Sequence, residues 1–234
     1  GTFGEDCAAK YNFTRDAQDK FAMASVQRAQ DAIKNGAFKD EIAPVTVKDR
    51  KGERVVDTDE GPGKINIDKI PTLKPAFKKD GTITAAASSS INDGAAALVM
   101  MRESTAKKLG AKPLARIVSH ATHAQEPEWF ATAPLGATQK ALAKAGWQVG
   151  DVQLWEINEA FAVVPMALMK ELDLPHDKVN VNGGACALGH PIGASGARIM
   201  VTLIHALKAR GLTKGLATLC IGGGEATAMA LELV

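Results

Sequence analysis

The sequence predicts an α/β layered fold, on two observations. After residue 81, apolar runs of strand length alternate with amphipathic runs of helix length, and several of the helical runs stop at a glycine. The last two strand-like runs are separated by a short glycine-rich turn that leaves no room for a crossover helix. Alternating elements build a sheet covered by helices, and the closing pair predicts an antiparallel hairpin.

The first 80 residues contain a higher proportion of charged residues than the rest of the chain. They carry 15 Lys/Arg and 14 Asp/Glu, or 29 of 80, against 25 charged residues in the following 154. This predicts a solvent-rich segment followed by a better-buried domain. Within the segment, Thr14 is a helix N-cap, Ala22, Val26, Ala29 and Ile33 share one helical face, and Gly36 is a stop signal. Residues 38–77 predict short strands and long loops.

The elements of the second part follow from apolar periodicity. The run at Ala97–Met101 predicts a buried strand because it is continuously apolar. The other predicted strands are Ala115–Ser119, Leu154–Ile157, Val179–Val181, Leu216–Cys220 and Ala226–Leu233, and the predicted helices are Ser104–Leu109, Thr138–Ala145, Phe161–Leu172 and Ser195–Arg210.

Composition excludes several classes of partner. The 28 Lys/Arg against 26 Asp/Glu leave a net charge of +2, so we expect no nucleic-acid partner. No apolar run reaches the roughly 18 residues that span a bilayer, so we expect no membrane partner. Three cysteines lie far apart, without a CxxC spacing, which predicts no metal site and a reducing compartment, the cytoplasm. The chain starts at Gly1 and none of its seven methionines is at position 1, so we expect a piece of a larger protein.

Polar residues follow the predicted strand Leu154–Ile157. Asn158 and Glu159 come at its carboxyl end, before a helix, which is the ligand-binding edge of an α/β sheet. The alternative is an asparagine helix cap followed by an acidic first turn, and spacing alone favours this cap.

A glycine-rich segment surrounds His190. Residues 182–198 hold five glycines and one proline, and they run into an amphipathic helix. Glycine backbones and helix N-termini both approach polar ligands closely. The spacing is neither a P-loop nor a dinucleotide fingerprint. A single histidine is more often structural, but one fixed between Gly189 and Pro191 is presented by a rigid loop.

The third unusual segment is Cys220, followed by three glycines at Gly222–Gly224. A cysteine at the end of a strand, together with a histidine, suggests thiolate chemistry. Sequence separation does not show whether His190 and Cys220 meet, so catalytic and structural interpretations both stay open.

These segments, taken together, resemble the thiolase family and within it acetyl-CoA acetyltransferases of the biosynthetic type. The motifs that carry the resemblance run along nearly the whole chain: Gly1-Thr2 with Glu5, the helix start Thr14–Asp19, Phe38–Ile42, Pro75–Phe77, Asn92–Ala97, N-E-A-F-A at Asn158–Ala162, G-G-x-x-x-L-G-H-P-I-G-A-S-G-A-R at Gly183–Arg198, and C-I-G-G-G at Cys220–Gly224.

The resemblance implies a core of two similar βαβαβαββ halves and a loop domain that covers coenzyme A. Residues 1–91 would be most of the loop domain, and 92–234 the C-terminal core half. The family's nucleophilic cysteine lies in the first core half, and Cys7 does not match it. We therefore expect a missing N-terminal half as partner, an inactive isolated chain, and a homo-oligomer, dimer or tetramer, when complete.

Four residues match the other catalytic groups of the family. The resemblance implies that His190 activates the missing thiol and, with a water held by Asn158, lines one oxyanion hole. Cys220 would be the acid/base, and the N–H of Gly222 would contribute to a second oxyanion hole. The reaction would be Claisen condensation of two acetyl-CoA to acetoacetyl-CoA, and its reverse thiolysis.

The same resemblance implies a pantetheine channel along Ala85, Ser89, Ala160 and Phe161, with Lys74 and its basic neighbours near the nucleotide phosphates. No cofactor is expected, because acetyl-CoA and acetoacetyl-CoA are substrates. Two alternatives are kept: a non-catalytic coenzyme A-binding or assembly fragment of a split thiolase, and a Cys–His thioester hydrolase with Cys220 as nucleophile.

Overall fold

A computed structural model describes residues 1–50 and 52–234. The first part contains α1 (Thr2–Tyr11), α2 (Arg15–Lys34), β1 (Val45–Asp49), β2 (Gly52–Val56), α3 (Glu60–Lys64) and a 3₁₀ helix (Ile67–Thr72). The second part contains α4 (Glu103–Leu109), β3 (Ala115–Ala124), α5 (Ala133–Ala145), β4 (Leu154–Ile157), α6 (Val163–Leu172), α7 (Ala185–Leu188), α8 (Ile192–Ala209), β5 (Lys214–Cys220) and β6 (Glu225–Leu233). Further 3₁₀ turns cover Pro127–Thr132, Val149–Asp151 and His176–Lys178.

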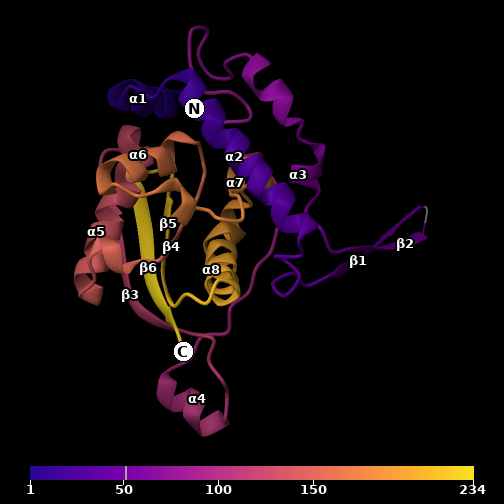
Figure 1. The fold of residues 1–234 in the computed structure, drawn as a ribbon, viewed down its shortest axis with the longest axis vertical. Coiled ribbons are helices and arrows are strands. Elements are labelled where there is room, and N and C mark those ends of the chain that lie inside the picture. The colour runs from indigo at the N-terminus through magenta and orange to yellow at the C-terminus, as the bar shows by residue number, and fades with distance from the viewer. Residues whose placement is uncertain (51) are drawn as a thin grey trace.

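The central sheet has the strand order β3-β6-β5-β4 (Figure 1). β4 and β5 are parallel, whereas β6 runs antiparallel to both β5 and β3. The predicted closing hairpin is therefore confirmed. The strand predicted at Val179–Val181 is reduced to isolated bridges, one of which pairs Val179 with Trp155 at the β4 edge.

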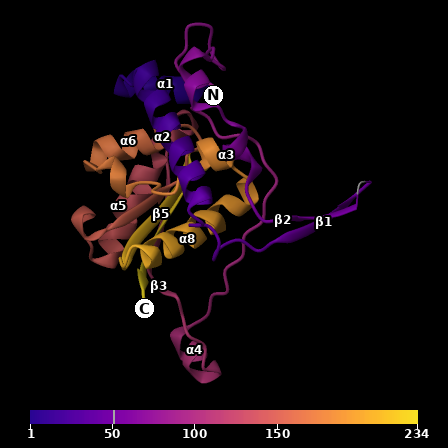
Figure 2. The same ribbon diagram turned by 45° about the vertical axis from the view of Figure 1, so that its right-hand side comes forward.

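Helices cover both faces of this sheet, which confirms the α/β layered fold. On one face, α5 and α6 contribute Ala137, Ala141 and Leu168 to a core that includes Leu216. On the other face, α8 packs Leu203 and Leu207 against a second cluster that includes the next residue, Ala217. α2 lies across the end of these layers, close to α7 (Figures 1 and 2).

Local signals explain α2 well. The hydroxyl of Thr14 accepts a hydrogen bond of 3.1 Å from the N–H of Ala17, which confirms the N-cap. Val26 and Ala29 are fully buried and pack against Ile70 and Ala187, so the predicted apolar face is the packed one. α1 was not predicted; it buries Cys7 and Ala8.

The prediction of a buried strand at Ala97–Met101 is wrong. The segment is in neither a helix nor a strand, and the Val99 and Met100 side chains are 89% and 67% exposed. A continuous apolar run is compatible with several environments, and its pairing partner decides between them. The packed alternation of strands and helices begins instead at β3. The division into 1–91 and 92–234 stays a prediction.

Two features project from the layers. β1 and β2 form an antiparallel hairpin that points away from the sheet, and α4 lies at the end of an extended connection (Figures 1 and 2). The hairpin agrees with the short strands predicted within residues 38–77. Among the described residues, no helix has both the length and the apolarity to cross a membrane.

Candidate active site

The parallel pairing of β4 with β5 brings two predicted site residues to one edge of the sheet. Ile157 pairs with Thr218, and the N–H of Asn158 continues the ladder by donating to the Thr218 carbonyl at 3.0 Å. Asn158 therefore leaves β4 beside the end of β5, where Cys220 lies. Both side chains are buried, with Asn158 only 1% exposed.

Asn158 lies against His190. Its Nδ2 is 3.3 Å from the Nε2 atom of the imidazole, while its Oδ1 is buried and accepts no hydrogen bond from any described residue. A buried carbonyl oxygen that accepts no hydrogen bond has lost its hydrogen bonds to bulk water without a replacement. Such oxygens are rare in folded proteins unless a bound water or ligand donates to them. This oxygen fits the predicted role of Asn158 in holding a water.

His190 is fixed at the start of α8 by its own backbone and side chain. Its N–H donates to the Ser90 carbonyl at 3.0 Å, and its Nδ1 is 2.5 Å from the Ser195 hydroxyl. Burial, aided by the charge of Arg198, lowers the pKa of His190 below its usual value. The imidazole is therefore neutral at pH 7 and has one nitrogen available as a base.

The loop that carries His190 is held by Glu159, which the sequence places at the ligand-binding edge without indicating this structural role. This fully buried carboxylate accepts hydrogen bonds from Ser25 Oγ at 2.7 Å, Asn180 Nδ2 at 2.8 Å and the N–H of Cys186 at 3.0 Å. Gly184 is required beside it, because a Cβ there would lie 2.3 Å from the carboxyl carbon.

Asn180 secures the other side of this carboxylate. Its Oδ1 accepts from the N–H of Ile157 and its Nδ2 donates to the Ile157 carbonyl, both at 2.8 Å. The backbone of Asn180 is left-handed, with φ of 47°, a conformation that asparagine tolerates better than most residues. The V-N-V-N-G-G stretch was the available signal, but nothing local distinguished Asn180 from a turn residue.

Cys220 ends β5 in a buried position, and burial raises its pKa to about 12. No hydrogen bond joins its thiol to His190 among the described residues. The turn that follows is exposed at Gly222, whose N–H donates to none of the described residues. A free backbone N–H at the sheet edge is the type of group that stabilises an oxyanion.

The four predicted pantetheine residues lie on two segments that touch. The N–H and the hydroxyl of Ser89 both donate to the Ala160 carbonyl at 3.1 Å. The ring of Phe161 is half-buried and lies edge-on to Phe77 at 5.6 Å. Ala85 is exposed, as is Lys74.

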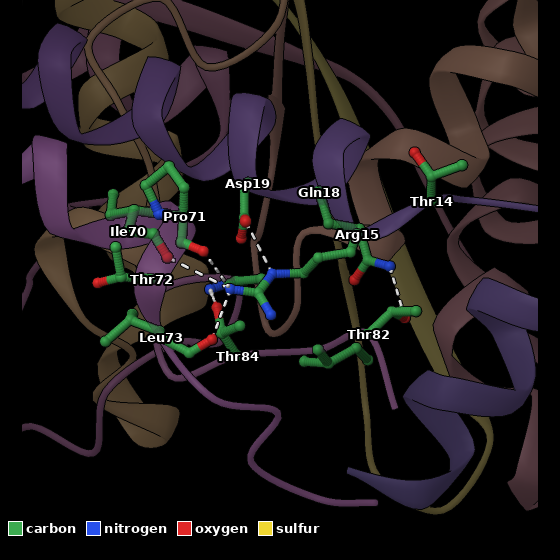
Figure 3. Close-up of polar contacts among 12 residues, drawn as sticks. Thr14, Arg15, Gln18, Asp19, Ile70, Pro71, Thr72, Leu73, Thr82 and Thr84 are labelled. Carbon is green, nitrogen blue, oxygen red and sulfur yellow. Dashed lines mark hydrogen bonds and ion pairs between the residues drawn. The ribbon is translucent and has the colours of Figure 1, made fainter. Parts of the chain in front are cut away.

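Charged side chains of α1 and α2 form hydrogen bonds with the backbone of the neighbouring loops. Glu5 is nearly buried and accepts from the N–H groups of Thr82 and Ile83 at 2.9 Å, just before Ala85. Figure 3 shows the corresponding arrangement at Arg15, whose guanidinium pairs with Asp19 and reaches the carbonyl of Leu73, both at 2.7 Å. The 3₁₀ helix and the segment after it are thereby attached to α2.

The other two thiols are also buried. Burial raises the pKa of Cys7 to about 12 and that of Cys186 well above its usual value. In residues 1–50 and 52–234, no three His, Cys, Asp or Glu side chains are placed to hold a metal ion.

The chain matches one family along almost its whole length. Residues 1–104 match the family described as "Thiolase, N-terminal domain", and residues 111–233 match "Thiolase, C-terminal domain". A probable acetyl-CoA acetyltransferase of Dictyostelium discoideum is 54% identical over 233 residues, which are 99% of this chain and 56% of the relative. The acetyl-CoA acetyltransferase of Chromobacterium violaceum is 53% identical over 234 residues, 99% of this chain and 60% of the relative.

Comparison with solved structures gives the same family. The acetyl-CoA acetyltransferase of Bacillus anthracis superposes with a TM-score of 0.96 at 48% identity, and human mitochondrial 3-ketoacyl-CoA thiolase with 0.91 at 38%. Each comparison covers 99% of this chain and 59% of the other. The chain thus spans less than two thirds of the length of these relatives. Because the C-terminal family match alone exceeds half of the chain and the fold agrees closely, the chain belongs to the thiolase family.

Proposed function

We propose that the chain carries part of the active site of an acetyl-CoA C-acetyltransferase, which condenses two acetyl-CoA to acetoacetyl-CoA and catalyses the reverse thiolysis. The observation that carries this proposal is the contact between His190 and Asn158 at the sheet edge where Cys220 ends β5. A neutral imidazole, an amide oxygen without a donor and a thiol are the groups that two-step acyl transfer between thiols requires.

The reaction has two steps in this proposal. A nucleophilic thiol gives its proton to Nε2 of His190 and attacks the first acetyl-CoA. Coenzyme A leaves as a thiolate and takes the proton of the Cys220 thiol, so that an acetylated thiol, a Cys220 thiolate and a protonated His190 remain. A methyl proton of the second acetyl-CoA then passes to the Cys220 thiolate, and the resulting enolate attacks the acetyl group. A carbon–carbon bond forms, the enzyme thiol leaves as thiolate, and this thiolate takes its proton back from His190.

Electrostatics support these roles. The raised pKa of Cys220 means that it is protonated at rest, so it is ready to return a proton to a leaving thiolate. Its action as a base requires that the thiolate form only while substrate is bound. The free N–H of Gly222 and the water on Asn158 would stabilise the two oxyanions, and losing one such donor costs roughly 3 kcal/mol in the barrier.

We also propose that the acyl-accepting thiol comes from outside these 234 residues. Cys7, Cys186 and Cys220 are all buried with raised pKa values, and a thiol of that kind is a poor nucleophile. A Cys–His hydrolase that uses Cys220 is disfavoured for the same reason. Acetyl-CoA and acetoacetyl-CoA are the proposed substrates, with pantetheine along Ala85, Ser89, Ala160 and Phe161. Homo-oligomerisation and a cytoplasmic location stay predictions.

A chimera tests the function. The part of the Chromobacterium violaceum relative that lies outside the matched region is joined to this chain, and thiolysis of acetoacetyl-CoA is assayed. We expect activity in the chimera, none in the chain alone, and losses of at least about a hundredfold for His190→Ala and Cys220→Ala. The control Glu103→Gln removes an exposed carboxyl and keeps full activity.

Other outcomes contradict specific parts of the proposal. A folded chimera that binds coenzyme A without turnover would favour the assembly fragment. Intact mass of the chain alone after incubation with acetyl-CoA should show no added acetyl group. An acetyl group on Cys220 would favour the hydrolase instead.

A further inference from the structure

Ser195 makes the second side-chain contact of His190. It lies in the first turn of α8, is 1% exposed, and places its Oγ 2.5 Å from Nδ1 of His190 and 3.0 Å from the Pro191 carbonyl oxygen. Ser195 lies within the Gly183–Arg198 motif, but the function proposed above gives it no role.

The hydrogen bonds that the Ser195 hydroxyl can make determine the tautomer of His190. A serine hydroxyl has one hydrogen, and a carbonyl oxygen can only accept. When that hydrogen points to the Pro191 carbonyl, the short contact with the imidazole is a hydrogen bond only if Nδ1 carries a proton and its N–H donates to Oγ.

The opposite side of the ring gives the same result. The Nδ2 of Asn158 is a donor and lies 3.3 Å from Nε2, so Nε2 must present its lone pair. The reverse assignment, with the proton on Nε2, requires the Asn158 amide to be rotated so that Oδ1 faces the ring. It also takes the Ser195 hydrogen away from Pro191.

We propose that Ser195 is a positioning residue that holds His190 as the Nδ1–H tautomer, so that Nε2 keeps its lone pair toward the active site. The consequence for catalysis rests on the proposed function, in which Nε2 accepts a thiol proton. The same hydroxyl continues to accept from Nδ1 after Nε2 takes up a proton, so the hydrogen bonds on the Nδ1 side of the ring do not change.

Nitrogen NMR reads this tautomer directly. In the 234-residue chain labelled with ¹⁵N-histidine, the His190 signals are those lost in His190→Gln. We expect Nδ1 to have the shift of a protonated nitrogen and Nε2 that of an unprotonated one. Ser195→Ala should move the tautomer ratio about fivefold toward Nε2–H, the effect of losing one ordinary hydrogen bond. Ser195→Thr restores a hydroxyl and should restore the ratio.

The control Ser119→Ala removes another buried hydroxyl, which donates to the Ala141 carbonyl at 2.7 Å, and should leave the His190 signals unchanged. An Nε2–H tautomer in the unmodified chain overturns the proposal, and so does a ratio that Ser195→Ala does not change. If Ser195→Ala fails to fold, the spectrum of the unmodified chain still decides.

The role of Ser195 and the proposed function can be rejected separately, because the tautomer of His190 is measured without acyl transfer. In an active chimera, Ser195→Ala should lower kcat about fivefold with little change in KM, and Ser195→Thr should recover it. An inactive chimera with an Nδ1–H histidine would reject the proposed reaction and leave the assignment of Ser195 in place.

Discussion

Ser25 on α2 donates a hydrogen bond of 2.7 Å to Oε2 of Glu159, 134 residues later in the chain. Ser25 Oγ in turn accepts from the N–H of Gly184 at 3.0 Å. A single buried carboxylate thus ties α2, the end of β4 and the loop that carries His190. The position of the catalytic candidates depends on this connection as much as on the sheet.

Replacing Glu159 should therefore destabilise the protein. Glu159→Gln keeps the shape of the side chain but turns one acceptor oxygen into a donor that faces other donors. We expect a loss of about 2 kcal/mol in the free energy of unfolding, measured in urea. Glu103→Gln, at an exposed carboxyl of α4, should cost less than about 0.5 kcal/mol. Equal losses for the two variants would contradict this role.

Arg15 and Asp19 should behave as a coupled pair. Asp19 is 5% exposed, so Arg15→Gln leaves a buried carboxylate without its cation and should cost about 2 kcal/mol. Adding Asp19→Asn should recover part of that loss, as a double-mutant cycle in urea would show. The exposed pair of Asp16 and Lys20 is the control, with an expected coupling below about 0.5 kcal/mol. Additive losses at Arg15 and Asp19 would argue against the pairing.

Stability should fall as pH rises through neutrality. Burial raises the pKa of Glu41 from 4.5 to about 7, against the opposing hydrogen bond from Thr202, and raises that of Glu156 to about 8. These two carboxyls bind more protons in the folded protein than in the unfolded chain between pH 4.5 and these values, so their contribution to stability is largest below that window and is lost across it. The lowered pKa values of His176 and His190 act in the opposite direction, but only below about pH 6.5, so the fall dominates through neutrality.

Glu41→Gln should flatten this profile by on the order of 2 kcal/mol between pH 5 and pH 8. Urea unfolding at several pH values measures it, and the exposed Glu53→Gln should leave the fall in place. A Glu41→Gln profile as steep as that of the unmodified protein would refute the assignment to Glu41.

The exposed segment at residues 91–101 should make the isolated chain self-associate. Ile91, Val99, Met100 and Met101 are all exposed, and apolar surface of this kind promotes association. Light scattering should show larger species at higher concentration, and Val99→Lys should reduce them. Val45→Lys, at an exposed valine of the β1–β2 hairpin, is the matched control. A concentration-independent monomer would contradict the expectation.

Local patterns sufficed for much of the fold. The N-cap at Thr14 and the apolar face at Val26 and Ala29 depend on neighbours within a few residues, so periodicity predicted α2. β5 and β6 were predictable because the turn between them permits a single connection. Residues 97–101 failed because an apolar run gives the same signal whether or not a strand pairs with it.

The site was predictable in its segments and not in its contacts. Asn158, His190 and Cys220 stand out because their residue types are unusual beside strands and glycines. Ser25, Asn180 and Ser195 do not, because each acts through a side chain brought near by folding. A serine in a helix has many ordinary explanations until its hydroxyl is seen against an imidazole.

Asn180 shows how little freedom such a contact leaves. Its side-chain amide pairs with the N–H and the carbonyl of Ile157, as the peptide group of a neighbouring strand would, while its own backbone is left-handed. Glycine meets the backbone demand alone, aspartate lacks the N–H donors, and glutamine places the amide one methylene too far. A library randomised at codon 180 and selected for folding should therefore return asparagine, at a site that makes no contact with substrate in the proposed reaction.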